Sequence, residues 1–184
     1  MSNRNNGSFF VATSYLNSHF GFNGNHRKQF KRHSDGSRSS VDKNLEGFID
    51  TSKRLAGKLR NINASLILVA PLPQHPDFIP ELYSRQWFRP SPAEIYQKTK
   101  RDFLERQRKH ILEAMNALTI EVNNIYVFDP FDKFCDKKNC YVTRDNTYLF
   151  SDDDHISKEG AILISNDLLS MISQINSQKS NQTN

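Results

Sequence analysis

One short stretch of the sequence, from Ser151 to Ser157, holds residue types that together could activate a hydroxyl group. It reads Ser-Asp-Asp-Asp-His-Ile-Ser, with Asp152 three positions before His155. On a tight loop this spacing lets the carboxylate accept a hydrogen bond from one imidazole nitrogen while the other nitrogen serves as a base. A serine is a poor nucleophile until such a base removes its proton. The spacing therefore predicts His155 as a general base and Asp152 as the residue that orients it.

The two acidic residues between them, Asp153 and Asp154, are predicted to have other roles. They are too close in sequence to His155 to orient its ring in the same way, so we expect them to form loop hydrogen bonds or to cap the following helix. An Asp-x-x-His pair alone also occurs in structural loops. Its meaning depends on the elements that position it.

The hydrophobic pattern predicts an α/β fold with a parallel sheet in three layers, because apolar strand-like runs alternate with amphipathic helical stretches. Ligand sites on such sheets lie at the carboxyl ends of the strands, which the last loop would join. The buried face of the last helix is predicted to use Ile162, Leu163, Leu168, Leu169 and Ile172. The expected elements are strands at 9–13, 65–70 and 120–128 and helices at 41–61, from Ser91 through Tyr96 to Leu118, and from a Ser157 cap.

Length and charge indicate one domain over residues 9–173, with a disordered start (1–8) and a disordered tail (174–184). The net charge of +5 is uneven, because residues 20–40 form a basic loop with five Lys or Arg residues and one acidic residue. This loop leaves nucleic-acid binding open as an alternative, although no basic stripe interleaved with aromatic residues accompanies it. No apolar run is long enough for a membrane span, and the sequence as written predicts no export signal.

Two cysteines, Cys135 and Cys140, flank the turn-forming residues Asp-Lys-Lys-Asn. They could form a disulfide across a hairpin, which would indicate an oxidising compartment, or remain free thiols. Two cysteines alone do not make a closed zinc site. We therefore expect no metal and no cofactor.

Together, these features resemble the C-terminal part of the SGNH hydrolases. The stretch from Tyr148 to Ala161 is similar to the Asp-Asp-Asp-His-Leu-Ser run, leading into Gly-Ala, of SGNH domains fused to membrane acyltransferases that O-acetylate cell-surface polysaccharides. Those domains also tend to carry a Cys-loop-Cys hairpin upstream, like Cys135 and Cys140. The resemblance implies a flavodoxin-like fold, His155 as base, Asp152 as its partner, and Gly160 as a point of close helix packing.

The nucleophile half of the family pattern is not found. The family has a Gly-Asp-Ser motif directly after its first strand, whereas Gly7-Ser8 precedes a strand and Asp35-Gly36-Ser37 follows no apolar run. The three predicted strands match the family's third, fourth and fifth strands, so the fold is expected to lack its first two, leaving residues 9–13 at an exposed edge. The resemblance offers Asn17 as an oxyanion donor, with a loop-capping role as the alternative.

The resemblance therefore implies acyl (acetyl) transfer or ester hydrolysis on carbohydrate by a catalytically incomplete fragment. Its partners would be a carbohydrate acceptor, an acyl donor and a membrane acyltransferase portion supplied by another chain, which would place it at the periplasmic face of a membrane. The alternative is a non-catalytic module that binds carbohydrate or a protein partner. Its substrate rim would use the aromatic residues Tyr83, Trp87 and Phe88.

Overall fold

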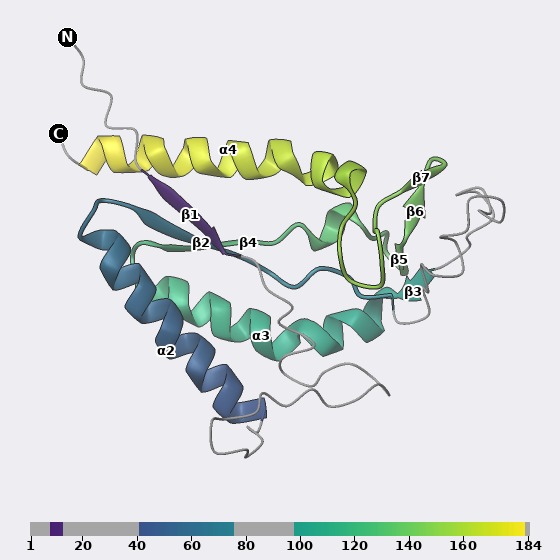
Figure 1. The fold of residues 1–184 in the computed structure, drawn as a ribbon, viewed down its shortest axis with the longest axis horizontal. Helices are drawn as coiled ribbons and strands as arrows, with labels where there is room; N and C mark the ends of the chain where they lie inside the picture. The colour runs from purple at the N-terminus through teal and green to yellow at the C-terminus, as the bar shows by residue number, and fades with distance from the viewer. Residues whose placement is uncertain (1–7, 13–40, 76–97, 183–184) are drawn as a thin grey trace, which may run out of the picture.

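A computed structural model describes residues 8–12, 41–75 and 98–182 of the chain. Its elements are β1 (Phe9–Ala12), α2 (Val41–Arg60), β2 (Ser65–Val69), β3 (Lys98–Lys100), α3 (Arg101–Glu121), β4 (Ile125–Phe128), the 3-10 helix η4 (Phe131–Lys133), β5 (Asn139–Tyr141), β6 (Thr143–Arg144), β7 (Thr147–Tyr148) and α4 (Lys158–Gln182). A parallel sheet in the order β1-β2-β4 forms the middle layer. Helix α4 covers one face, and α2 and α3 cover the other (Figure 1). The predicted α/β class with a parallel sheet is confirmed.

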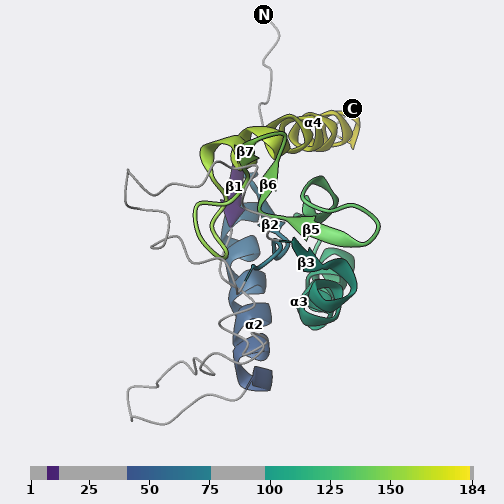
Figure 2. The same ribbon diagram turned by 90° about the vertical axis from the view of Figure 1, so that its right-hand side faces the viewer.

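Strand β2 is the centre of the fold, and its alternating side chains divide the core in two. Leu66 and Leu68 pack with residues of α2 and α3, whereas Ile67 belongs to the cluster that includes Ile164 and Ile175 of α4. This alternation is the period of two that any strand imposes on its side chains. Figure 2 shows α4 and α3 on opposite sides of the sheet.

The second helix begins and ends later than the sequence predicted. Residues 98–100 form a strand that pairs antiparallel with β5, and α3 starts at Arg101, whose main-chain N–H donates to Lys138 O at 2.9 Å. At its other end, Ile120 lies in α3 and is 84% exposed, where a strand from 120 to 128 was expected. Both errors come from pairing that sequence periodicity does not show: β3 is held by β5, and only 125–128 pair with β2.

The buried face of α4 matches the prediction at Leu163, Leu168 and Ile172, which pack against the core, and differs from it elsewhere. Ile162 and Leu169 are exposed, and the helix buries Ile164 and Ile175 instead. It continues to Gln182, so residues 174–182 belong to an ordered helix where a disordered tail was expected. Partly buried residues complete the packed face at helical spacing, namely Leu163, Leu168, Met171 and Ile172.

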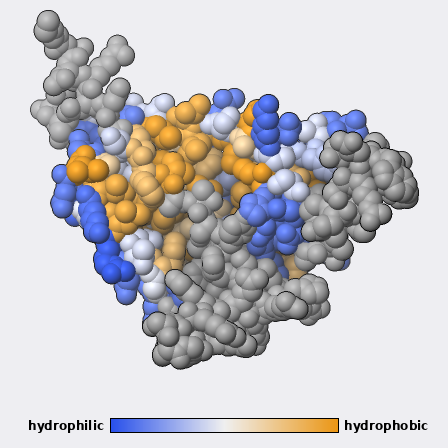
Figure 3. Space-filling model, viewed as in Figure 1, coloured by the Kyte–Doolittle hydropathy of each residue, from blue (hydrophilic) through white to orange (hydrophobic). Residues whose placement is uncertain are grey.

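Strand β1 lies at the edge of the described sheet, as predicted, and pairs with β2. Phe10 is 48% and Val11 is 40% exposed. Figure 3 shows hydrophobic side chains gathered on this side of the molecule, between α4 and α2. An apolar edge of this kind is a surface on which another strand can pair.

Candidate active site

The Asp-His loop is a short connection closed at its base and joined directly to α4. Phe150 and Ile156 form an antiparallel bridge across the base, and Ser151 N–H donates to His155 O at 2.8 Å. Ser157 caps the helix as predicted, because its Oγ accepts from Gly160 N–H at 3.0 Å and donates to Tyr148 O at 2.6 Å. The loop is therefore fixed at both ends by hydrogen bonds.

Gly160 packs against the strand that enters the loop. A Cβ at this position would lie 2.2 Å from Leu149 O, a separation that real structures do not contain. Ser157 N–H donates to the same carbonyl at 2.9 Å. Only glycine lets the first turn of α4 come this close to the main chain, which agrees with the packing role predicted for it.

Asp152 and His155 make direct contact. Asp152 Oδ2 lies 2.6 Å from His155 Nδ1, while Oδ1 accepts from His155 N–H at 2.6 Å and from Asp154 N–H at 3.1 Å. One carboxylate thus folds the loop and holds the ring. A carboxylate at Nδ1 keeps the proton on that nitrogen and makes Nε2 the nitrogen that acts as a base.

Asp154 also reaches the imidazole, although only a loop or capping role was predicted for it. Its Oδ1 lies 3.3 Å from His155 Nδ1, because the loop turns back on itself around Asp152. Partial burial, followed by the nearby charges of Asp153 and Asp152, raises the pKa of Asp154 to about 7. This carboxyl group therefore stays largely protonated below about pH 7.

Asp152, Asp154 and His155 are also the one group of described residues whose ligand atoms could meet at a metal ion, within 4.8 Å of one another. Both oxygens of Asp152, however, already accept hydrogen bonds from the loop and the ring. The arrangement suits an oriented base better than a metal centre, since each of these bonds would compete with an ion for the carboxylate.

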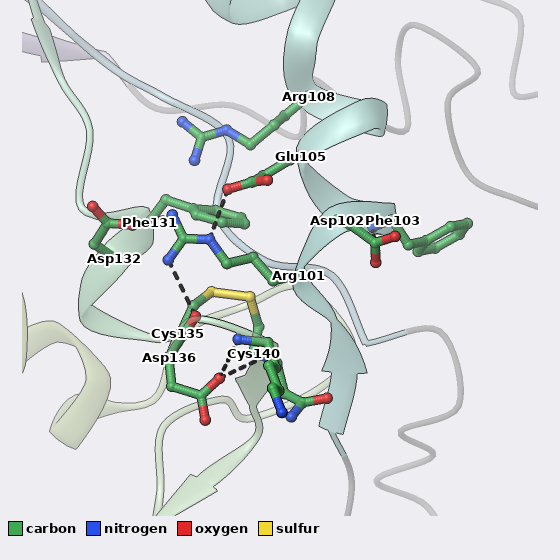
Figure 4. Close-up of polar contacts among 12 residues, drawn as sticks. Arg101, Asp102, Phe103, Glu105, Arg108, Phe131, Asp132, Cys135, Asp136 and Cys140 are labelled. Atoms are coloured by element: carbon green, nitrogen blue, oxygen red, sulfur yellow. Dashed lines mark hydrogen bonds and ion pairs between the residues drawn. A yellow bond between two sulfur atoms is a disulfide. The ribbon is translucent and has the colours of Figure 1, made fainter.

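The cysteine hairpin lies on the side of the fold toward α3. Cys135 and Cys140 form a disulfide, and Asp136 closes the turn by accepting from Lys138 N–H at 2.6 Å and Asn139 N–H at 2.7 Å. Figure 4 shows this turn beside Arg101, whose guanidinium donates to Asp136 O at 3.2 Å. The hairpin and the start of α3 therefore support each other.

A pocket of about 620 Å³ lies along α3, next to the residues that follow β4. Its deepest cation, Arg108, donates to Asp129 at 2.5 Å and lies 4.2 Å over the ring of Phe131. The other cations in its lining are paired in the same way: Arg101 with Glu105 and Asp132, Arg106 with Asp102, and Lys109 with Glu113. Because these charges neutralise one another, we assign the pocket no ligand.

Several residues singled out from the sequence lie outside the described residues. These are the oxyanion candidate, the aromatic rim and the basic loop, namely Asn17, Tyr83, Trp87, Phe88 and 20–40. Their roles stay predictions.

Comparison with known protein families identifies a relationship. A family model described as "SGNH domain (fused to AT3 domains)" matches residues 5–170. The chain belongs to this SGNH-domain family. No curated protein and no solved structure matches it.

In this SGNH domain the hydroxyl groups of the loop are used for structure. Ser151 Oγ donates to His155 O at 3.2 Å, and Ser157 Oγ donates to Tyr148 O. Neither hydroxyl is bonded to the His155 ring in these contacts. The printed contacts of both hydroxyls therefore hold the main chain of the loop in place.

Among the helices within 41–75 and 98–182, none is both long and apolar enough to cross a membrane.

Proposed function

We propose that this SGNH domain supplies the base half of a serine-type acyl-transfer or ester-hydrolysis site. The observation that carries the proposal is the 2.6 Å contact of Asp152 Oδ2 with His155 Nδ1 on a loop fixed at the entry to α4. His155 would remove the proton of a hydroxyl nucleophile and later return a proton to the leaving group. Asp152 would keep the ring in the required tautomer and stabilise the imidazolium that forms.

The nucleophile, in this proposal, arrives on a strand that pairs beside β1. Four consecutive apolar residues, Phe9 to Ala12, are typical of a strand buried on both faces inside a parallel sheet, yet Phe10 and Val11 are half exposed. An added strand would pair with the β1 edge and cover both side chains. A Gly-Asp-Ser turn following that strand would then lie at the same edge of the sheet as the Asp-His loop.

The family context suggests the substrates. AT3 domains appear in the family description as fusion partners, so we propose an acyl donor delivered by a membrane acyltransferase portion and a carbohydrate hydroxyl as acceptor. The disulfide is in keeping with an oxidising compartment, such as the periplasmic face of a membrane. The acyl group would pass from the donor to the serine and then to the sugar hydroxyl or to water.

The test is complementation. A polypeptide encoded beside this chain, holding membrane spans and an apolar strand followed by Gly-Asp-Ser, is co-expressed with it and assayed for hydrolysis of a chromogenic acetyl ester. We expect turnover that falls by about 10³-fold or more in His155→Ala and about 10⁴-fold in Asp152→Asn. Asp153→Asn is the matched control: it removes a neighbouring charge without removing the carboxylate bonded to Nδ1, and it should retain most of the activity.

Two results would count against the proposal. One is a genome with no such segment next to this chain. The other is a complex whose turnover is the same in His155→Ala. Carbohydrate binding that survives His155→Ala, without turnover, would instead favour the non-catalytic binding module.

A further inference from the structure

A second histidine, His75, lies beneath the Asp-His loop and has no part in the chemistry proposed above. It follows β2 by six residues and is 1% exposed. Its main-chain N–H donates to Asp153 O at 2.7 Å, and its ring meets Phe150 edge-on, with centroids 4.8 Å apart. His75 therefore contacts the loop twice, once at its middle and once at its base.

The ring of His75 is held in turn by β3. Its Nδ1 lies 3.0 Å from Thr99 Oγ1, and Thr99 pairs with Cys140 of the disulfide hairpin. On the other side, Phe150 packs against Phe134 with centroids 5.1 Å apart. A continuous set of contacts thus runs from the disulfide hairpin through His75 to the loop.

An apolar side chain would fill the space of His75 without the free-energy cost of burying a polar nitrogen. His75 Nε2 is buried and has no hydrogen-bond partner among the described residues, and an unmade bond of this kind costs about 1–3 kcal/mol. Burial also lowers the pKa of His75 to about 4, so the ring is neutral at working pH and brings no positive charge beneath the acidic loop. A neutral imidazole can bond to Thr99 without competing with His155 for Asp152 and Asp154.

We propose that His75 is a positioning residue, which holds the 151–155 loop so that Asp152 meets His155 Nδ1. The proposal rests on the proposed function for what the loop does, but the positioning itself can be measured without catalysis. If the His75 ring is removed, the base of the loop loses its contact at Phe150. The main-chain N–H of residue 75 still donates to Asp153 O, but the ring no longer anchors it to Thr99 and Phe150. The Asp152–His155 contact should then become intermittent.

The experiment is nitrogen-15 and proton NMR of the His155 imidazole in the intact chain. The Nδ1–H resonance and the nitrogen shifts report the hydrogen bond to Asp152 and the tautomer. In His75→Ala we expect the Nδ1–H resonance to be lost and the two tautomers to mix. His75→Phe, which keeps the ring contact with Phe150, should show a smaller change.

A matched control separates positioning from general destabilisation. Asn124 is also buried and polar, and its Nδ2 donates to Ala56 O at 2.9 Å and Ala64 O at 3.2 Å, at the amino end of β4. Asn124→Ala should lower the melting temperature and leave the His155 spectrum unchanged. If His75→Ala does not fold, Thr99→Val removes only the hydroxyl that holds the His75 ring, and it should still weaken the Nδ1–H resonance.

Wild-type His155 spectra in both His75→Ala and Thr99→Val, or the same spectral change in Asn124→Ala, would overturn the proposal. Failure of the acyl-transfer proposal would appear in the complementation assay and would leave these spectra unaffected. The two proposals therefore fail separately.

Discussion

At the scale of single residues, Asp152 links the folding of the loop to the orientation of its base. Oδ1 accepts two main-chain N–H groups while Oδ2 lies against His155 Nδ1. Asp152 cannot be replaced by a different acceptor without moving the ring, because all three contacts belong to one rigid carboxylate. Asp154, 3.3 Å from the same nitrogen, adds a second carboxyl group whose raised pKa keeps it largely protonated below neutral pH.

Two titrating groups of this region, the buried His75 and the partly buried Asp154, predict opposite effects of pH on stability. The pKa of His75 is about 4 in the folded chain, against 6.5 when unfolded, so the unfolded chain binds more protons between these values and stability rises with pH across this window. The rise is about 3 kcal/mol for a shift of this size. The pKa of Asp154 is about 7 in the folded chain, against 3.8 when unfolded, so the folded chain binds more protons between these values. The contribution of Asp154 to the free energy of unfolding therefore falls as pH rises from 3.8 to 7.

Urea unfolding from pH 4 to 7.5 checks both signs. His75→Phe should lose the rise in the free energy of unfolding between pH 4 and 6.5, and Asp154→Asn should make that rise steeper. A His75→Phe profile parallel to that of the wild type would show that His75 titrates normally in the folded chain.

At the scale of elements, the start of α4 determines where the loop can lie. Ser157 and Gly160 hold the start of α4 against Tyr148 and Leu149. The two ends of the Asp-His loop are therefore fixed relative to each other. The disulfide hairpin supports the loop from the other side: its strand β5 pairs with β3, and Thr99 of β3 contacts His75, which lies against the loop. The site is thus built from elements that are far apart in the sequence.

Two glycine substitutions test this packing. Gly160→Ala would place a Cβ 2.2 Å from a main-chain oxygen, and we expect it to destabilise the fold by about 2 kcal/mol or more because the first turn of α4 must move. Gly57 lies in α2 with nothing within 4 Å of the same position, so Gly57→Ala should stabilise by about 0.5–1 kcal/mol. Thermal unfolding measures both, and equal effects would contradict the close approach at Gly160.

At the scale of the whole molecule, the sequence predicted those features that depend on residues close together in the chain. The spacing of Asp152 and His155, the Ser157 cap and the apolar run of β2 follow from neighbouring residues, and the structure has them where expected. The late start of α3 and the place of His75 depend on pairing between β3 and β5 and on contact between loops distant in sequence. A lone histidine after a Pro-rich stretch carries no sequence signal of that contact.

The proposed function also predicts how active the chain is by itself. Three parallel strands present the Asp-His loop at one end of the sheet and an apolar edge, β1, at its side. A base without a nucleophile gives little rate enhancement, because the covalent acyl step cannot occur. Under the proposed function, the chain alone would therefore hold the base and still need a nucleophile from a second polypeptide.

The most direct measurement is the hydrolysis of a chromogenic acetyl ester by the purified chain alone, followed by intact mass after treatment with a serine-reactive phosphonate. We predict little or no product above the uncatalysed rate, no covalent adduct, and no difference between the wild type and His155→Ala. Robust turnover that His155→Ala abolishes, together with a phosphonate adduct on a serine of this chain, would contradict the claim that the nucleophile is supplied from elsewhere.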